Sequence, residues 1–358
     1  MSTHTLLISI VTHNSARVIQ RCLDGVFGQS RKDFLVSVFD NASQDGTWEW
    51  LQKQARPMAL RRSPMNIGFS AAHNLALTEH NCEEFALVLN PDVYLCPNFM
   101  ENALQGFQVN PRIGSISGKL LRVPESDFIS SQWSPGDPHE AAEIIDSTGM
   151  YLTSQQRHLD RGADEPDLGQ YQKREYVFGA SGAAALYRRA MIEDVSINGE
   201  FFDDAFFAYR EDADLAWRAQ GLDWKCLYVP EAVAYHVRKV RPENRRELPA
   251  EINCHSVKNR FLMRIKNVAA STYFRFFIPM TLRDLQVIGY VFLREHSSLP
   301  GLWYPIRHLR QVLVWRREIK RRRRLPSRDL EYWFHHRAVP ITPATGEAPS
   351  SHASFKLE

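Results

Sequence analysis

The sequence predicts an α/β fold in which helices flank a mostly parallel sheet, followed by a C-terminal amphipathic helical region. The first observation is the unbroken apolar run at residues 85–89, which is typical of a strand buried on both faces. The second is a pair of strand-to-helix units at the start of the chain, which implies parallel strands joined by right-handed crossovers. The third is a change after Asn267, where apolar and aromatic residues accompany concentrated arginine.

The composition limits the function classes. The chain has 358 residues, 44% of them hydrophobic, which is enough for one large or two ordinary globular domains. A net charge of +3 argues against a general nucleic-acid-binding protein. Five cysteines are scattered without a C-x-x-C pair, as expected of reduced thiols in a cytosolic protein. We expect neither an export signal nor a membrane span, because no apolar stretch has the required length and flanks.

The first two units place polar residues after strands. Residues 6–11 form a β-branched apolar run, and Ser15 is expected to be the N-cap of a helix over residues 16–28. Residues 34–39 form the second strand, followed by a polar cluster at 40–45 and a helix that carries Trp48 and Trp50. A loop with an N-cap explains one aspartate of this cluster, but not so many polar groups. We therefore favour a nucleotide contact at Asp40.

The third and fourth units surround the buried strand at 85–89. Gly68 and small residues open a helix that extends to about Thr78, which would allow a diphosphate or a sugar to approach backbone N–H groups. Pro91 ends the buried strand, so Asp92 enters the crevice beyond the carboxyl ends of the strands. The alternative role of Asp92 is that of a turn residue or an N-cap. A helix over residues 99–109 and a strand over 113–121 follow.

The middle of the chain combines loops with isolated titratable residues. Residues 123–175 are rich in loop-forming residues, with hairpin-like strands near 147–153, and should cover the crevice. The tiny residues around Gly182 fit either close packing or a substrate contact. Carboxylates at 211–214 suit the start of a helix, but their apolar neighbours would also raise a pKa toward that of a general base. His236 follows a strand over 224–229 and is either hydrogen-bonded or a ligand.

The C-terminal part suggests a membrane surface. Residues 258–267 and 274–293 mix apolar and charged residues, and an arginine cluster lies at 316–324. Apolar faces beside arginine are typical of helices in a membrane interface, although a packing helix with a solvated charge run has the same pattern. The tail from 339 to 358, rich in Pro, Ser, Thr and Ala, is predicted to be disordered.

Taken together, these residues resemble the family 2 inverting glycosyltransferases of the GT-A fold, and among them the bacterial rhamnosyltransferase-like members. The resemblance covers about residues 6–267 and depends on a series of short motifs in a fixed order, at 9–15, 40–46, 66–69, 89–92, 182–185, 211–214 and 235–236. It implies a Rossmann-like sheet in a catalytic domain over 1–267. The residue pattern after this domain predicts a helical, basic region over 268–338, a candidate for membrane association, and a disordered tail over 339–358.

The resemblance also implies roles for individual residues. Asp212 corresponds to the general base, with Glu211 beside it as a second catalytic carboxylate. Asp92 corresponds to the metal-binding aspartate of the D-x-D motif, and His236 to a late metal or diphosphate contact. The expected cofactor is Mg²⁺ or Mn²⁺. The nucleotide-sugar contacts implied are Thr12, Asn14, Asp40, Asn41, Asn66, Gly68, Asn74, Asn90 and Gly182. Asn90 replaces the first aspartate of D-x-D, so the cation would rest on one carboxylate, the donor phosphates and water.

The resulting hypothesis is a transferase that moves L-rhamnose from dTDP-rhamnose onto a lipid-linked saccharide for cell-envelope polysaccharide. It would work as a cytoplasmic protein held peripherally at the inner face of the cell membrane, and a homo-oligomer is compatible with this. Another UDP- or GDP-sugar is an alternative donor, because no residue distinguishes thymine from uracil. A nucleotidyltransferase would need a basic, Gly-rich loop after the first strand, and residues 11–15 are not one. A non-catalytic membrane-binding scaffold is the alternative outside the enzymes.

Overall fold

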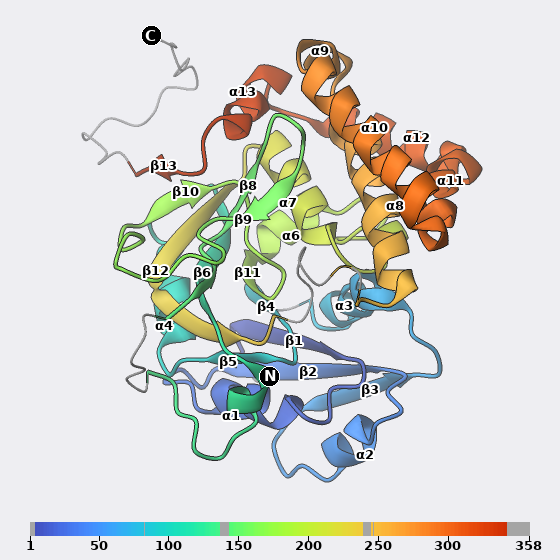
Figure 1. Ribbon diagram of the computed structural model, residues 1–358. Helices are drawn as coiled ribbons and strands as arrows, with labels where there is room; N and C mark the ends of the chain where they lie inside the picture. Colours follow the sequence, from blue (N-terminus) through green and yellow to red (C-terminus); the bar gives the residue numbers. More distant parts are fainter. Residues whose placement is uncertain (1–3, 82, 137–142, 239–244, 246, 342–358) are drawn as a thin grey trace.

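The computed structural model describes residues 4–81, 83–136, 143–238, 245 and 247–341. Figure 1 shows a central sheet with helices on both faces and a group of C-terminal helices beside it. The order of strands across the sheet is β13 (Val339–Pro340), β10 (Glu175–Val177), β12 (Lys225–His236), β6 (Ile113–Arg122), β11 (Ala184–Arg188), β4 (Phe85–Leu89), β1 (Leu6–Thr12), β2 (Phe34–Asn41) and β3 (Ala59–Ser63).

The middle of this sheet is mostly parallel, as predicted. Strand β1 pairs in parallel with β2 and β4, β2 with β3, and β6 with β12, whereas β11 is antiparallel to both of its neighbours. The carboxyl ends of β1, β2, β4, β6 and β12 therefore lie along one edge, together with the amino end of β11. Loops that follow these ends converge there, which is where an open α/β sheet places a ligand.

Helices cover both faces of the sheet because its strands are buried on both sides. Along β1, Leu6, Ile8 and Ile10 pack with α1 (Ile19–Phe27), α2 (Thr47–Gln52) and α4 (Phe99–Gly106). Leu7, which points the other way, packs in the cluster of α3 (Gly68–Glu79), α6 (Arg189–Val195) and α7 (Glu211–Gly221). All strand-to-helix units expected between residues 6 and 121 are present.

Three local differences from the predictions have clear causes. Helix α1 begins at Ile19 and not directly after Ser15, since the Ser15 carbonyl accepts the N–H groups of Val18 and Ile19 in a preceding turn. Strand β3 was not predicted because it is an edge strand with exposed arginines and no apolar run. Strand β5 (Val93–Leu95) was not predicted because three residues carry too little pattern, yet it pairs with the end of β12.

The predicted loop-rich segment at 123–175 contains short elements. After α5 (Glu125–Phe128) come β7 (Ile145–Ser147), β8 (Met150–Leu152) and β9 (His158–Asp160); residues 137–142 lie outside the described part of the chain. Strand β7 pairs with the end of β6, and β8 forms a hairpin with β9. The segment thereby reaches the edge where the carboxyl ends of the strands meet.

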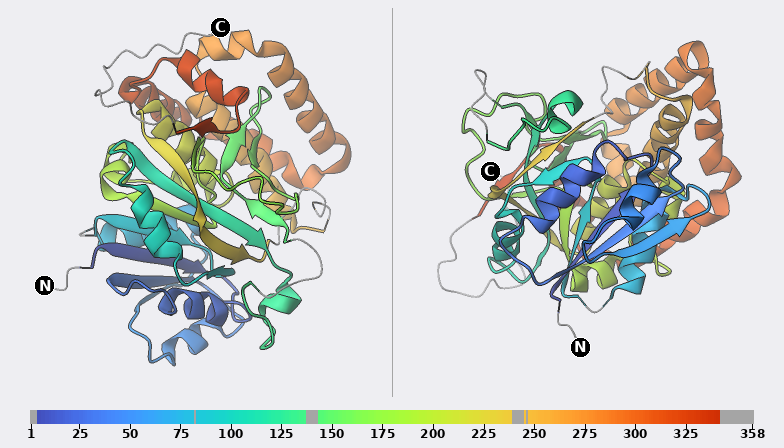
Figure 2. Two further views of the ribbon diagram at one scale, coloured as in Figure 1. Left: turned by 90° about the vertical axis from the view of Figure 1, so that its left-hand side faces the viewer. Right: turned by 90° about the horizontal axis from the view of Figure 1, so that it is seen from below.

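The C-terminal helices pack against the catalytic half of the molecule. They are α8 (Ala250–Asn267), α9 (Ala270–Arg275), α10 (Phe277–Arg294), α11 (Leu299–Arg307), α12 (Leu309–Arg322) and α13 (Ser327–Glu331). In the views of Figures 1 and 2, α10, α11 and α12 lie on the outer side of α8. One apolar cluster contains Trp217 of α7, Leu262 of α8, Met280 of α10 and Val312 of α12, so packing is continuous across the predicted boundary at Asn267.

The chain beyond the helices is ordered further than predicted. Val339 and Pro340 form strand β13, which pairs with β10 at the edge of the sheet, although the predicted disordered tail included both residues. Backbone pairing with an existing edge orders this segment despite its composition. The remainder of that predicted tail, residues 342–358, lies outside the described residues. Within the described ranges, no helix has both the length and the apolar content needed to cross a membrane.

Candidate functional site

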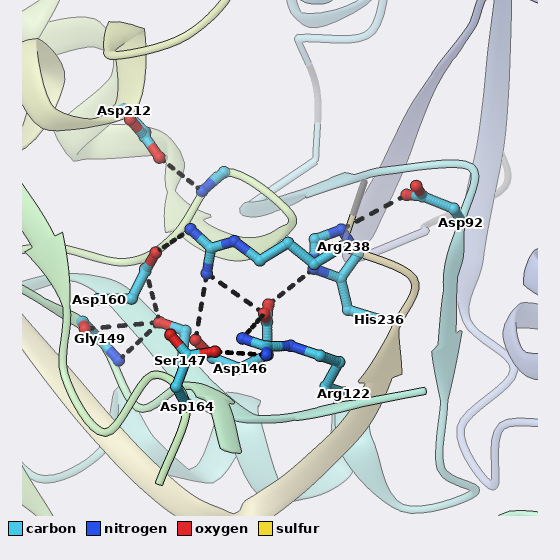
Figure 3. Close-up of polar contacts among 11 residues, drawn as sticks. Asp92, Arg122, Asp146, Ser147, Gly149, Asp160, Asp164, Asp212, His236 and Arg238 are labelled. Carbon is cyan, nitrogen blue, oxygen red and sulfur yellow. Dashed lines mark hydrogen bonds and ion pairs between the residues drawn. The ribbon is translucent and has the colours of Figure 1, made fainter. Parts of the chain in front are cut away.

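The edge formed by the carboxyl ends of the strands brings three predicted residues together. Asp92 follows β4, His236 ends β12, and Asp212 lies in the first turn of α7. Figure 3 shows Asp92 and Asp212 on opposite sides of this region, with His236 and Arg238 between them. The arrangement separates one carboxylate beside a histidine from a second carboxylate at a helix start.

Asp92 and His236 meet because β5 turns back immediately after Asp92 and pairs with β12. Val93 lies opposite His236 in this antiparallel pair, and the Asp92 carbonyl accepts the N–H of Val237 at 3.1 Å. The His236 Nε2 atom is 3.5 Å from Asp92 Oδ1. On the other side of the ring, Nδ1 is 2.8 Å from Asp146 Oδ2. The hydrogen bond between Asp146 and Nδ1 fixes the orientation of the His236 ring, so that Nε2 faces Asp92.

Asp146 is the centre of a buried charge network. Its side chain is 1% exposed and accepts from Arg238 as well as His236, with Arg122 Nη2 3.6 Å away. Burial by itself would raise the pKa of Asp146, but His236 and the two guanidinium groups outweigh it and hold the pKa well below its usual range. Burial likewise opposes the charged form of His236, yet the Asp146 and Asp92 carboxylates raise its pKa to about 10. The ring therefore holds its proton more strongly than an ordinary histidine.

Asp212 is held by the loop before β11. Its Oδ2 accepts the Gly182 N–H at 3.0 Å, and a Cβ at Gly182 would lie 3.4 Å from that oxygen. Burial raises the pKa of Asp212, and the Asp160 carboxylate adds to this, while the Gly182 N–H opposes it. Glu211 is 6% exposed; burial and the Asp212 charge raise its pKa well above normal. One Glu211 oxygen, Oε2, is buried without a hydrogen-bond partner among the described residues. Both carboxyl groups thus bind a proton more strongly than an ordinary carboxylate, as expected of a general base.

The backbone before α7 is strained. Phe207, Tyr209 and Arg210 all have positive φ angles, of 67°, 70° and 73°. Such conformations persist only where the surroundings enforce them. Here the Asn259 amide of α8 donates to the carbonyls of residues 206, 208 and 209 at 2.7–2.9 Å. Helix α8 therefore fixes the segment that presents Glu211 and Asp212.

Asp40 lies at a second part of the same edge. It is fully buried, accepts from the Thr12 hydroxyl at 3.0 Å, and lies 3.2 Å from Arg62 of β3. Ser43 and Arg62 also line a groove of about 490 Å³, together with Ala42, Gln44, Ser63 and Pro64. Asp40 and Thr12 therefore support the wall of this groove, which has the size of a small-ligand site.

The remaining predicted contacts differ in their surroundings. Asn14 accepts the Gln44 N–H beside the groove, and Asn66 is exposed. Asn41 uses its amide on Ile67 N–H and the Gly68 carbonyl, which holds the loop before α3. Gly68 has a φ of +88°, and a Cβ there would lie 2.6 Å from Phe207. This loop therefore contacts the strained segment before α7.

Two predicted asparagines are separated by the fold. Asn90 stays at the site edge, where its backbone N–H donates to the Ala183 carbonyl. Asn74 instead lies inside α3 and uses both ends of its amide on residues 202 and 204, with its Nδ2 2.8 Å from Asp204. The structure thus does not bring the Asn74 amide to the edge where Asp92 and His236 meet.

Asp92 and His236 have the donor set of a hard divalent cation such as Mg²⁺ or Mn²⁺. A carboxylate oxygen and an imidazole nitrogen point toward each other, and Asp146 anchors the far nitrogen. The described residues contain no group of three or more His, Cys, Asp or Glu side chains suited to a metal. A cation at this site would therefore complete its coordination with substrate oxygens and water.

Sequence reasoning missed three charged residues of this site. Asp146 and Asp160 come from short strands in a loop-rich segment, and nothing in the local pattern distinguishes them from loop carboxylates. Arg238 could have been found, because it stands two residues after His236 and an extended chain directs alternate side chains to one side. It pairs with Asp146 at 3.2 Å and with Asp160 at 2.5 Å.

We predict that Asp146→Asn destabilises the protein by about 3–5 kcal/mol, since it removes the buried carboxylate that His236, Arg238 and Arg122 share. Asp164→Asn is the matched control: this carboxylate also pairs with Arg122, but its side chain is 60% exposed. Its effect should stay within about 1 kcal/mol. Urea unfolding at pH 7 measures both. Equal destabilisation by the two variants would contradict the central role of Asp146.

Comparisons with known proteins identify the family of the chain. The family model described as "Glycosyl transferase family 2" matches residues 7–196, which are 190 of the 358 residues. No curated protein sequence matches the chain.

Solved structures share the fold at low identity. GalNAc-T7 with UDP, GalNAc and Mn²⁺ has a TM-score of 0.54 at 12% identity, over 73% of this chain and 48% of that one. S. aureus TarS 1-349 in complex with UDP-GlcNAc has a TM-score of 0.51 at 16% identity, over 83% and 78%. The chain thus spans about half the length of the first of these structures. The family match covers more than half of this chain and includes β1, β2, β4 and Asp92. The chain belongs to glycosyl transferase family 2.

Proposed function

We propose that the protein is an inverting glycosyltransferase that moves a sugar from a nucleoside diphosphate donor to an acceptor hydroxyl. One observation carries the proposal: Asp92 with His236 lies on one side of the site, and the base-like carboxylate Asp212 lies on the other (Figure 3). Nucleotide-sugar transfer needs charge neutralisation at the leaving diphosphate and a proton acceptor at the attacking hydroxyl.

In the proposed reaction, the acceptor oxygen attacks the anomeric carbon from the face opposite the diphosphate. The bond from that carbon to the diphosphate oxygen breaks, and the diphosphate leaves with the electron pair. Asp212 accepts the proton of the attacking hydroxyl. A single displacement of this kind inverts the anomeric centre, and it needs no enzyme nucleophile. A bound Mg²⁺ or Mn²⁺ at Asp92 and His236 would neutralise charge on the diphosphate.

The donor and the acceptor follow from the family resemblance and the C-terminal surface. We favour dTDP-rhamnose as the donor, on the resemblance of the sequence motifs to rhamnosyltransferase-like members. Another UDP- or GDP-sugar is the alternative, because no residue distinguishes thymine from uracil. The acceptor proposed is a lipid-linked saccharide for cell-envelope polysaccharide. The protein would meet it as a cytoplasmic enzyme, peripherally bound to the inner face of the cell membrane.

An exposed apolar stripe supports the membrane part of this proposal. Phe274, Ile278, Leu282, Leu285 and Leu293 are between 57% and 76% exposed and follow a helical spacing along α9 and α10. Trp303, Ile306 and Leu309 continue the exposed apolar surface on α11 and α12. Exposed arginines accompany it at positions 275, 294, 307, 310 and 317. Apolar and cationic side chains on the same outer helices suit an anionic bilayer.

The arginine cluster at 316–324 contributes less to this surface than the sequence suggested. Arg322 donates to the carbonyls of residues 194 and 196, Arg323 donates to the Asn267 carbonyl, and Arg324 pairs with the Asp194 carboxylate at 2.7 Å. These contacts attach α12 to the catalytic half. The apolar stripe, rather than this cluster, is the main membrane-facing feature in our proposal.

The donor is tested with a panel of dTDP-, UDP- and GDP-sugars, with and without Mn²⁺. We expect metal-dependent binding and slow hydrolysis of at least one donor. Asp92→Ala should weaken metal-dependent binding, and His236→Ala should do so less, whereas Asp164→Ala should match the parent. If no donor binds, the protein is better described as a non-catalytic scaffold. Overlapping metal titrations of Asp92→Ala and the parent would remove Asp92 as a ligand.

Asp212→Asn should reduce transfer by about 10²-fold or more, while donor binding stays within a few-fold, because a base acts in the transition state. Asp212 must be deprotonated to act as the base, so the rate should rise with pH as this carboxyl group loses its proton. Because its pKa is raised, this rise should occur at a higher pH than for an ordinary aspartate. The rise should disappear in Asp212→Asn. A larger loss in Glu211→Gln than in Asp212→Asn would move the base to Glu211.

Ile278→Glu combined with Leu285→Glu should lower binding to phosphatidylglycerol vesicles by about tenfold or more, since it puts charge into the apolar stripe. The control combines Val109→Glu with Leu168→Glu, which are exposed apolar residues outside the C-terminal helices. Vesicle co-sedimentation at low and high salt measures both, and salt should weaken the electrostatic part. Unchanged sedimentation together with a smaller oligomer would instead assign the stripe to a second copy of the chain.

A further inference from the structure

A second group of charges lies near Asp212. Arg210 is two residues before Asp212, and its Nη1 is 3.1 Å from His158 Nδ1. Arg157 lies one residue before His158, at the end of the β8–β9 turn, where its N–H donates to the Thr153 hydroxyl. The hairpin of the 123–175 segment therefore brings a second arginine next to the start of α7.

Helices α8 and α10 add further arginines to the same place. Arg260 Nη2 lies 3.4 Å from the Gln155 carbonyl of the β8–β9 turn and 3.2 Å from Asp284 Oδ1. Arg264 also pairs with Asp284. Arg283 immediately precedes Asp284 on α10. Three separate parts of the fold thus converge: the hairpin turn, the start of α7, and the facing sides of α8 and α10.

These arginines have little counter-charge. Among the described residues, Asp284 is the carboxylate that forms ion pairs with this group, and it serves Arg260 and Arg264 together. Burial and the repulsion of neighbouring guanidinium groups lower the pKa of Arg210 to about 9 and that of Arg260 to about 10. The same causes, with Arg157 as the first charged neighbour, lower the pKa of Arg283. The contrast with Arg238 is direct, because two carboxylates pair with that residue and its pKa is raised.

Unsatisfied donors point the same way. Arg260 is only 5% exposed, and its Nε has no hydrogen-bond partner among the described residues. The Nε of Arg283 is likewise buried without a partner there. Gln156, in the same turn as Arg157, is 2% exposed and has neither amide atom bonded within the described ranges. Buried donors without partners are costly, and an anion with several acceptor oxygens would satisfy them.

We propose that Arg157, Arg210, Arg260 and Arg283 form an acceptor-side subsite for a phosphate or diphosphate group, so that the acceptor is a phosphorylated glycolipid. A guanidinium group can donate two parallel hydrogen bonds to the oxygens of one phosphate, so a cluster of arginines is suited to binding a phosphate group. Its place fits this role, because Arg210 adjoins the proton-accepting carboxylate Asp212. Arg283 stands on α10 between Leu282 and Leu285 of the apolar stripe, so an anionic head group bound here has its lipid chain beside the proposed membrane surface.

The assignment of this subsite to the acceptor rests on the proposed function, but its test does not need a nucleotide sugar. The probes are inorganic pyrophosphate and farnesyl diphosphate, titrated by calorimetry in EDTA so that no cation supports diphosphate binding at Asp92 and His236. Failure to bind any donor would sink the proposed function, whereas these titrations report on the arginine cluster alone.

The test variant combines Arg157→Gln with Arg283→Gln, and the matched control combines Arg17→Gln with Arg328→Gln, an equal change of charge at exposed positions outside the arginine cluster and the apolar stripe. The test variant should bind both probes about tenfold or more weakly, and the control should bind within about twofold of the parent. Arg157→Lys, which keeps the charge, should recover much of the loss. If the double variant loses its fold by circular dichroism, Arg157→Gln alone is used, because it alters a half-buried side chain in a turn.

Phosphatidylglycerol vesicles separate the two sources of phosphate. If the test variant loses vesicle binding but binds farnesyl diphosphate like the parent, the cluster serves membrane head groups and the acceptor proposal is overturned. It is also overturned if the parent fails to bind pyrophosphate at millimolar concentration, or if parent and test variant bind both probes equally. Loss of diphosphate binding in the test variant, with the control unchanged, supports it.

Discussion

The antiparallel pairing of β5 with β12 is the constraint on which the site depends. Pro91 ends β4, and three residues later the chain has already turned back along the end of β12. Two hydrogen-bonded strands hold the backbones of residues 92–95 and 234–237 in a fixed register, so Asp92 and His236 face each other. A site preformed by backbone pairing loses little conformational entropy when a ligand binds.

Charge is distributed differently in the two groups of charged residues near Asp212. On the Asp92 side, Asp146 and Asp160 neutralise His236 and Arg238, and this buried network is hydrogen-bonded and internally balanced. Of the guanidinium groups at 157, 210, 260 and 283, Arg260 forms an ion pair among the described residues, with Asp284, which also pairs with Arg264. A balanced network gives rigidity, while an unbalanced one attracts an anion. We therefore assign a structural role to the network around Asp146 and an anionic ligand to the arginines at 157, 210, 260 and 283.

The C-terminal helices connect the site to the proposed membrane surface. Helix α8 contributes Asn259 to the strained segment before Asp212 and Arg260 to the arginine cluster, and α10 to α12 pack on its outer side. Met280 of α10, Val312 of α12 and Leu330 of α13 join Trp217 in an apolar cluster. Removing the helices would expose this core, so their role is best studied through substitutions on their outer face.

The sequence by itself determined the strand-to-helix order, the buried strands and the positions of Asp92, Asp212 and His236 at element ends, because hydrophobic periodicity and turn residues are local properties. It also identified the outer helices as amphipathic. Only the tertiary structure decided which charges meet. Asp146 and Asp160 come from short strands with no distinctive pattern, and their partners His236 and Arg238 are 78 to 92 residues away. The sequence pattern at 316–324 indicates a cationic surface. In the fold, however, Arg322 and Arg323 donate to backbone carbonyls and Arg324 pairs with a carboxylate. Pairing of this kind depends on long-range packing, which local sequence does not encode.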